Sequence, residues 1–238
     1  MRVALTGAEI AERVESIGEP ASTARLRNTL RVGVTPSAAL ICSTALHVAW
    51  CHSKPQRHLA MSSADEGRML ALLRGGELDL VIAPLPRGYN TAGLVTQVLY
   101  QITPFAYARR YHPLANAHSL AQLQTAAWAI VGPSVGGPVD VLKEALAVRR
   151  MPAARVAATC PDYASLLRLM AHTDLLGVLP HASLLVGAPK GQVVALRLRE
   201  ALPRYEMRLF ARMPLRPRVE RVVAELQREV CQVMSENA

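Results

Sequence analysis

The chain has 238 residues, 51% of them hydrophobic but only 4% aromatic, which is enough for one large domain or two smaller lobes with cores of Leu, Val and Ala. No apolar run approaches the roughly 18–20 residues that cross a bilayer, so a membrane span is excluded. The formal charge of +9 favours anionic partners, yet no basic run is interleaved with aromatic residues, which argues against direct nucleic-acid binding.

The N-terminus and the cysteines indicate the compartment. Residues 1–20 carry charges every few positions and no apolar stretch, so no secretion signal is recognised and a cytoplasmic location is expected. Four cysteines are scattered along the chain without C-x-x-C spacing: Cys42, Cys51, Cys160 and Cys231. We therefore expect free thiols in a reducing compartment, no metal site and no cofactor.

The first predicted element is an amphipathic helix over residues 6–17. Ile10, Val14 and Ile17 recur there at helical spacing, with charged residues between them. Gly18 and Pro20 end this helix, and the small, polar residues up to position 29 are typical of a linker.

From residue 30 onward, strand and helix patterns alternate. The first half predicts strands at 30–34, 58–63 and 78–83, with helices at 37–51 and 64–74. Gly75 and Gly76 close the second helix. The run 78–83 is almost entirely apolar, which is typical of a parallel strand buried on both faces. This order predicts an α/β fold with right-handed crossovers.

The second half repeats the pattern in a second lobe. Strands at 93–100 and 105–109 flank a first crossing at 101–104. The following strands are predicted at 128–131, 155–158 and 175–179, and the helices at 138–149, 163–172 and 181–185. Strands at 193–198 and 205–211 are expected to return to the first lobe, where the amphipathic helix 216–234 packs. The predicted fold is therefore α/β: two Rossmann-like lobes joined by two crossover strands, with the type 2 periplasmic-binding-protein-like architecture.

Several segments resemble a known family when they are taken in order. They are LRVGVTP (30–36), LLRGGELD (72–79), LVIAPLP (80–86), RRYHPLA (109–115), SLAQLQTAAWAI (119–130) and LLRLMAHTDLLGVLP (166–180). Their order is similar to that in the effector-binding domain of LysR-type transcriptional regulators, and the resemblance spans about residues 1–230. One departure lies at 174–180, where the glycines of the family's usual GLGIALLP are displaced.

The resemblance implies a function. The chain would be the effector-sensing portion of a bacterial LysR-type transcription factor, not an enzyme, and would assemble as a homodimer or homotetramer. RVALTGAE (2–9) resembles the point where the family's winged helix-turn-helix meets its linker helix, so DNA would be bound only by helices upstream of Met1. The expected parts are a partial wing and linker helix at 1–29, a first lobe at 30–100 and 193–238, and a second lobe at 101–192.

The ligand is expected where the strands end. In open parallel sheets, ligands bind beyond the carboxyl ends of the strands, and the helix N-termini that follow favour anions such as carboxylates. The residues there, which match the positions where the family binds its effectors, are Thr35, Pro36, Ser37, Ser62, Ser63, Ala64 and Pro84 in the first lobe, and Pro133, Ser134, Pro161 and Asp162 in the second. The serines could instead be ordinary N-caps. Asp162, which would repel an anion, is expected to cap the helix that begins at Tyr163.

Two other functions also fit parts of the sequence. A free-standing solute-binding protein would share the two-lobed fold, but the missing secretion signal argues against it. The segment 132–136 fits the G-x-S-x-G pattern of a serine hydrolase, with Ser134 as nucleophile. Asp162 with His172, or Asp174 with His181, would complete a triad in the required order. Pro133 restricts the backbone before Ser134, and the glycines that follow are typical of an ordinary loop, so we do not expect an enzyme.

Overall fold

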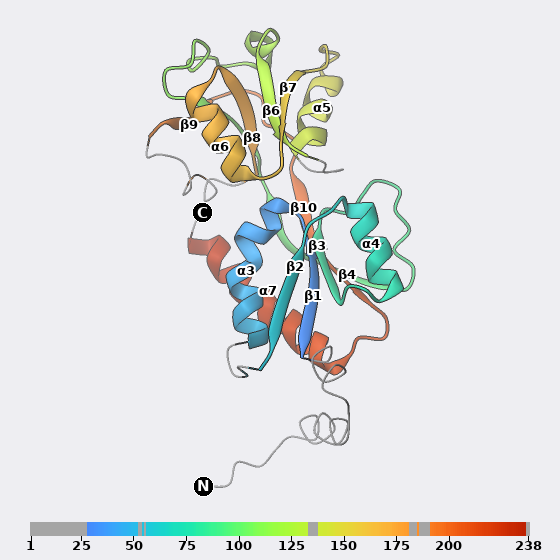
Figure 1. Ribbon diagram of the computed structural model, residues 1–238. Helices are drawn as coiled ribbons and strands as arrows, with labels where there is room; N and C mark the ends of the chain where they lie inside the picture. Colours follow the sequence, from blue (N-terminus) through green and yellow to red (C-terminus); the bar gives the residue numbers. More distant parts are fainter. Residues whose placement is uncertain are drawn as a thin grey trace, which may run out of the picture.

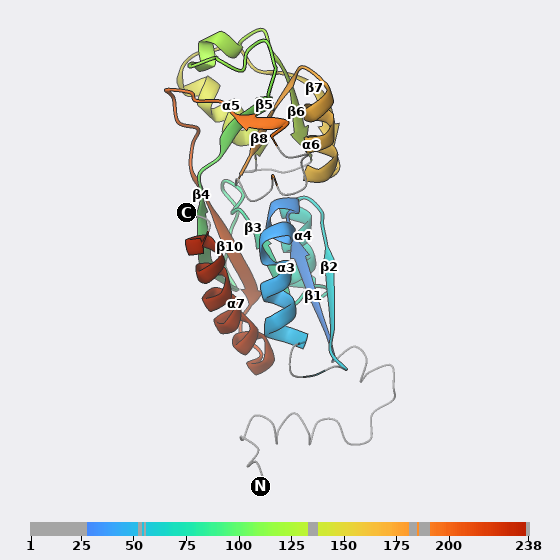
Figure 2. The ribbon, with the colours of Figure 1, turned by 90° about the vertical axis from the view of Figure 1, so that its left-hand side faces the viewer.

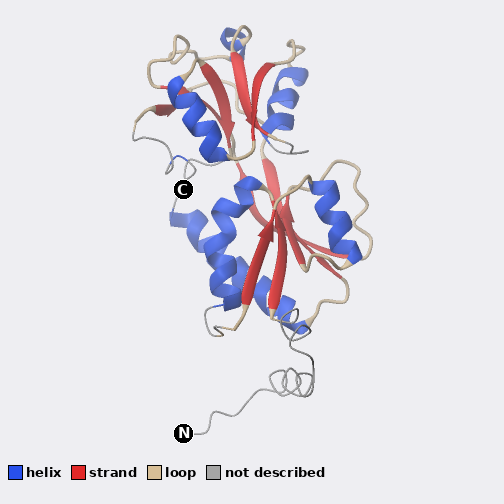
Figure 3. Ribbon diagram, in the orientation of Figure 1, coloured by secondary structure: helices blue, strands red, loops and turns tan. Residues whose placement is uncertain are grey.

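The computed structural model describes residues 28–51, 54, 56–132, 138–180, 185 and 191–236, without the side chains of 138–140 and 231–236. The predicted N-terminal helix and linker, and all but Leu185 of the predicted helix 181–185, lie outside the described residues. The described chain forms two five-stranded sheets, each flanked by helices (Figure 1, Figure 3).

The first sheet has the strand order β2-β1-β3-β10-β4. Its strands are β1 (Thr29–Val34), β2 (His58–Ser62), β3 (Leu80–Ala83), β4 (Leu94–Ile102) and β10 (Tyr205–Arg212). β1 is parallel to β2 and β3, whereas β10 is antiparallel to β3 and β4. Its helices are α3 (Pro36–Cys51), α4 (Glu66–Gly75) and α7 (Pro217–Glu236). The predicted alternation of strands and helices is confirmed in this lobe.

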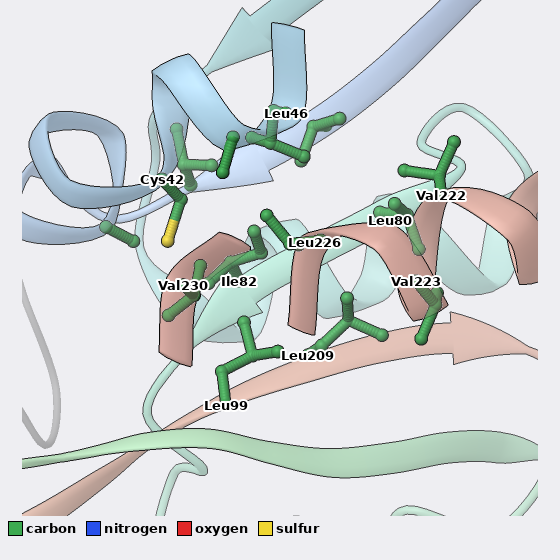
Figure 4. Close-up of a cluster of buried hydrophobic side chains, with 14 of the residues drawn as sticks. Cys42, Leu46, Leu80, Ile82, Leu99, Leu209, Val222, Val223, Leu226 and Val230 are labelled. Atoms are coloured by element: carbon green, nitrogen blue, oxygen red, sulfur yellow. The ribbon is translucent and has the colours of Figure 1, made fainter. Parts of the chain in front are cut away.

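The two faces of this sheet are covered by different helices. Leu80 and Ile82 of β3 point toward α3 and α7, where they pack with Leu46 and Leu226 (Figure 4). The intervening Val81 and Ala83 pack instead with the buried side chains of α4. Because successive side chains of a strand point to opposite faces, a strand between two helix layers must be apolar throughout, as the sequence of β3 indicates.

The second sheet has the order β7-β6-β8-β5-β9. Its strands are β5 (Phe105–Arg109), β6 (Ala127–Val131), β7 (Arg155–Cys160), β8 (Leu175–Leu179) and β9 (Val193–Ala195). A short 3-10 helix, η1 (Leu120–Leu123), precedes β6, and the α-helices are α5 (Pro138–Val148) and α6 (Tyr163–His172). Leu142 of α5 packs in one core cluster and Leu166 of α6 in another, so the helices cover opposite faces.

One strand does not lie where the sequence predicts. Residues 193–198 were expected to return to the first lobe, but Val193–Ala195 forms β9 and pairs with β5 in the second sheet. The return to the first lobe comes only with β10. The sequence of an apolar strand of three residues does not indicate which strand it will pair with. Here the pairing is decided by β5, the strand that lies beside β9 in the folded chain.

The lobes are joined at β4 and β10, which lie side by side as they approach the junction (Figure 2). The chain passes from β4 into β5 through residues 103–104, and from β9 into β10 through residues 196–204. Two connections between two α/β lobes are the arrangement that the sequence predicts. None of the helices in the described part of the chain is long and apolar enough to span a membrane.

Candidate functional site

The carboxyl ends of β1, β2 and β3 meet at one edge of the first sheet. Val34 pairs with Ile82 and Gly33 with Ser62, so the residues that follow each strand lie at the same edge. The backbone N–H of Thr35 donates to Ile82 O at 3.2 Å, so the pairing with β3 extends one residue beyond the end of β1. The structure thus places the predicted residues of the first lobe together at the end of the sheet from which α3 begins (Figure 1).

Thr35 and Ser37 are buried hydroxyl side chains at the start of α3, only 3% and 4% exposed. Ala38 N–H donates to Thr35 Oγ1 at 3.4 Å, and Ser37 Oγ lies 3.4 Å from the same oxygen. The N-terminal cap of α3 is therefore made by Thr35, because its oxygen accepts a backbone N–H that the helix leaves unpaired. Ser37 lies within the first turn, so the alternative that Ser37 is the cap is wrong.

Ser37 also faces the second lobe. The side chain near it there is Tyr163, the first residue of α6. Tyr163 is only 2% exposed and belongs to the core cluster that also contains Leu166 and Leu179. Burial and the nearby Tyr205 raise the pKa of Tyr163 well above its usual range, and the nearby Ser37 hydroxyl opposes that rise. The N-termini of α3 and α6 therefore meet across the junction.

Two further tyrosines lie at this junction, Tyr100 of β4 and Tyr205 of β10. Burial raises the pKa of Tyr100, and the neighbouring Cys42, Tyr205 and Tyr163 raise it further. Cys42 Sγ donates to Tyr100 Oη at 3.9 Å. Tyr205 Oη is buried and has no hydrogen-bond partner among the described residues. We call Tyr100, Tyr163 and Tyr205 the tyrosine cluster.

A buried carboxylate faces the same region. Glu66 at the start of α4 is 0% exposed, and its charge adds to the effect of burial in raising the pKa of Tyr205. The cluster and Glu66 were missed by the sequence analysis because no spacing connects residues 66, 100, 163 and 205. One signal was available: the chain has only six tyrosines, and three of them meet here.

The other predicted residues differ in their surroundings. Pro84 is buried, Ala64 is half-buried, and Ser62, Ser63 and Pro161 are exposed. Ser63 does not cap α4, because Asp65 accepts the Arg68 N–H at 2.9 Å and the helix begins at Glu66. Pro133 and Ser134 lie outside the described residues.

Asp162 caps α6, as expected. Its carboxylate accepts the Ser165 N–H at 2.7 Å, and this hydrogen bond lowers the pKa of Asp162. A charged cap at this position fixes the start of α6, and therefore the position of Tyr163, which follows it directly.

The described residues lend no support to a catalytic triad. Asp162 and His172 stand at opposite ends of α6, about 15 Å apart at 1.5 Å per residue. Asp174 instead pairs with Arg109 at 2.7 Å. The proposed nucleophile Ser134 and the alternative base His181 lie outside the described residues.

A cavity of about 520 Å³ lies between α3 and β2 of the first lobe. It is lined by residues of α3 and β2 that include Ser43, His47 and His58. The lining residue of α3 nearest to Ser37 is Ser43, six residues or about 9 Å further along the helix, so this cavity is separate from the predicted site at the junction.

Comparison with known proteins agrees with this architecture. Residues 23–231 match the family described as LysR substrate binding domain. A putative transcriptional regulator from Vibrio parahaemolyticus superimposes with a TM-score of 0.73 at 16% identity, covering 87% of this chain and 96% of that chain. A putative LysR family transcriptional regulator from Pseudomonas aeruginosa gives 0.67 at 14% identity, covering 95% and 82%.

The Synechocystis CcmR regulatory domain, in complex with 2-PG, also gives a TM-score of 0.67, at 17% identity, with 88% of this chain and 97% of that chain covered. At such identities the structural likeness shows the fold alone. That fold is the type 2 periplasmic-binding-protein-like fold that the sequence predicts.

Proposed function

The chain belongs to the family of LysR substrate-binding domains, and on this premise we propose that it senses a small-molecule effector for a transcriptional regulator. The effector binds between the two lobes and carries a carboxylate or another anionic group. The observation that carries this proposal is the pair of buried hydroxyls, Thr35 and Ser37, at the N-terminus of α3 opposite α6.

The preference for an anion follows from local electrostatics. A helix N-terminus carries a partial positive charge and unpaired backbone N–H groups, and hydroxyl side chains add donors. The first turn of α3 contains no acidic residue that would compensate this charge. The overall charge of +9 also attracts anions over longer distances. Glu66 is the opposing feature, because its buried carboxylate disfavours a second negative charge near Tyr205.

The proposed mechanism is a shift between lobe arrangements. An effector that contacts both lobes stabilises the arrangement in which both sets of contacts form. β4 and β10, which join the lobes, absorb the change. In the intact regulator, which we propose to be a cytoplasmic homodimer or homotetramer, the shift alters how the subunits present the DNA-reading helices. The CcmR domain in complex with 2-PG supports the idea that this fold accommodates a small molecule.

The alternatives have less support. A free-standing solute-binding protein would need the same cleft, but the family match over residues 23–231 favours the regulator. A hydrolase would need an acid and a base close together, and Asp162 and His172 are held apart by the length of α6.

The proposal is tested by a thermal-shift screen of the purified chain with small carboxylates, sulfonates and aromatic acids. A ligand at 100 times its Kd stabilises the protein by about 2.7 kcal/mol. Ser37→Ala should weaken binding of a hit by roughly tenfold or more, since a hydrogen bond to a charged group contributes about 1.5–3 kcal/mol. Ser43→Ala, six residues further along α3, is the matched control. A hit that Ser37→Ala and Thr35→Val leave unchanged would place the ligand elsewhere and contradict the proposal.

A further inference from the structure

The cavity between α3 and β2 has no role in the proposed function, which concerns the junction of the lobes. Its volume of about 520 Å³ lies within the range of about 300–1,000 Å³ that small-molecule sites usually have. β2 is the last strand in the order of the first sheet, so no described strand pairs with its outer edge. The cavity is therefore accessible beside an uncovered strand.

One wall of the cavity is a single face of α3. Ser43, His47 and Cys51 follow one another at intervals of four residues, so their side chains lie on the same side of the helix. Thr44 also lines this wall. The wall thus presents two hydroxyl groups and an imidazole, and an imidazole has an N–H donor in either protonation state.

The opposite wall combines a basic part with an apolar part. Arg57 and His58 stand where β2 begins, and they supply a guanidinium and a second imidazole. Leu59 and Met61 supply apolar surface, part of which is uncovered because Met61 is 42% exposed. None of the described lining residues is acidic. The two walls together match a molecule with a negative charge at one end and an apolar body at the other.

The basic part of the cavity is held in place by a buried tryptophan. Trp50, which is 2% exposed, donates its indole N–H to His58 O at 2.9 Å. The Arg57 guanidinium lies over the Trp50 ring, 4.1 Å from its centre, and Nη1 donates to Trp50 O at 3.4 Å. Cys51 Sγ donates to Arg57 O at 3.7 Å. Because these contacts order the guanidinium before a ligand arrives, binding costs less conformational entropy.

We propose that this cavity is a second ligand site, which takes a small carboxylic acid with an apolar body. The carboxylate lies against Arg57 and the two imidazoles, and the apolar body covers Leu59 and Met61. A guanidinium binds a carboxylate through paired N–H donors, which favours an acid over a neutral molecule of the same shape. The site does not depend on the proposed function, because its α3 residue nearest to Ser37 is Ser43, six residues further along the helix.

The test is NMR of the histidine side chains in the full 238-residue chain, with hexanoate as the probe. The imidazole signals of His47 and His58 should move on addition of hexanoate, because both rings line the cavity. The signal of His112, which is 6% exposed and lies in the second lobe, should not move. 1-Hexanol lacks the charge and inorganic phosphate lacks the apolar body, so each should bind roughly tenfold or more weakly than hexanoate.

Two substitutions show whether these shifts report on the cavity. Arg57→Gln should weaken hexanoate binding by roughly tenfold or more, because it removes the charged donor. Met61→Ala should weaken it by about fourfold or more, since each methylene that loses its apolar contact has about that effect. Met61→Ala leaves the contact between Arg57 and Trp50 in place, so it serves if Arg57→Gln disturbs the fold. Ser37→Ala is the control and should leave the affinity unchanged.

Three results would overturn the proposal. One is that neither histidine signal moves at about 10 mM hexanoate, tenfold above a weak Kd of 1 mM. Another is that the shifts persist with unchanged affinity in both Arg57→Gln and Met61→Ala. The third is weakening by Ser37→Ala alone, which would assign hexanoate to the junction and so support the proposed function instead. Failure of the second site and failure of the proposed function are thereby distinguished.

Discussion

Replacing Asp79 with Ala should destabilise the first lobe far more than an equivalent change at the surface. Asp79 lies between α4 and β3, and its side chain is only 2% exposed. It accepts the Arg31 backbone N–H at 3.0 Å and the Arg31 guanidinium at 3.2 Å through both Nε and Nη2. Arg216 and Arg218 at the start of α7 approach the same carboxylate at 4.0 and 3.9 Å. One carboxylate thus connects β1, β3 and α7.

The expected loss follows from what the substitution leaves behind. Removing one member of a buried ion pair costs about 3–5 kcal/mol, because the remaining charge stays in a poorly solvated place. The Arg31 side chain is 34% exposed and so recovers part of its hydration. The backbone N–H of Arg31 also loses its acceptor, which costs about 1–3 kcal/mol when no water replaces it. We therefore expect Asp79→Ala to lower the free energy of unfolding by about 3 kcal/mol.

Urea unfolding followed by circular dichroism measures this loss, and Asp174→Ala is the matched control. Asp174 also pairs with an arginine, Arg109, at 2.7 Å, but its side chain is 59% exposed. Exposed pairs contribute about 0–1 kcal/mol. Equal effects of the two substitutions would refute the argument, because burial is the difference that it relies on.

Three other outcomes are expected. Burial raises the pKa of the Cys42 thiol from 9.0 to about 12. Between these values the thiol of the unfolded chain loses its proton first, so the free energy of unfolding falls as the pH rises. In urea unfolding, Cys42→Ala should reduce the slope of this free energy against pH by up to about 1.4 kcal/mol per pH unit. Gly177→Ala should destabilise the second lobe by about 1–3 kcal/mol in the same assay, because a Cβ at this position would lie 2.4 Å from Met170 Sδ. Unchanged stability would show that the Met170 side chain can move away from the added methyl group. The purified chain should give no footprint on promoter DNA, because the family it matches is the LysR substrate binding domain; protection of a specific site would show that the chain itself reads DNA.

The sequence was a good guide to local structure. The spacing of apolar residues placed the described helices and most strands to within a few residues, because burial on one face imposes a period on the chain. Local chemistry also placed the Asp162 cap and the left-handed Gly76 at the end of α4, where φ is 82°. The extra Asp65 cap was missed because Ser63, Ala64 and Asp65 are all acceptable near a helix start.

The candidate site was predicted only in part. Thr35, Ser37 and Pro84 are buried at the expected edge, since parallel strands bring their carboxyl ends together whatever follows them. The roles of Thr35 and Ser37 could not be separated from the sequence, because either hydroxyl can serve as a cap. Only the positions of the surrounding helices show that Thr35 caps α3 while Ser37 faces Tyr163.

The sequence by itself determined which segments are strands and helices, and the order in which the two lobes are built, because these depend on neighbouring residues. Tertiary structure alone decided that β9 pairs in the second sheet and that Tyr100, Tyr163 and Tyr205 meet at the junction. These residues come from separate strands and from a helix of the other lobe. Their proximity depends on how the sheets pair and how the lobes pack, and no local pattern encodes a contact between such distant positions.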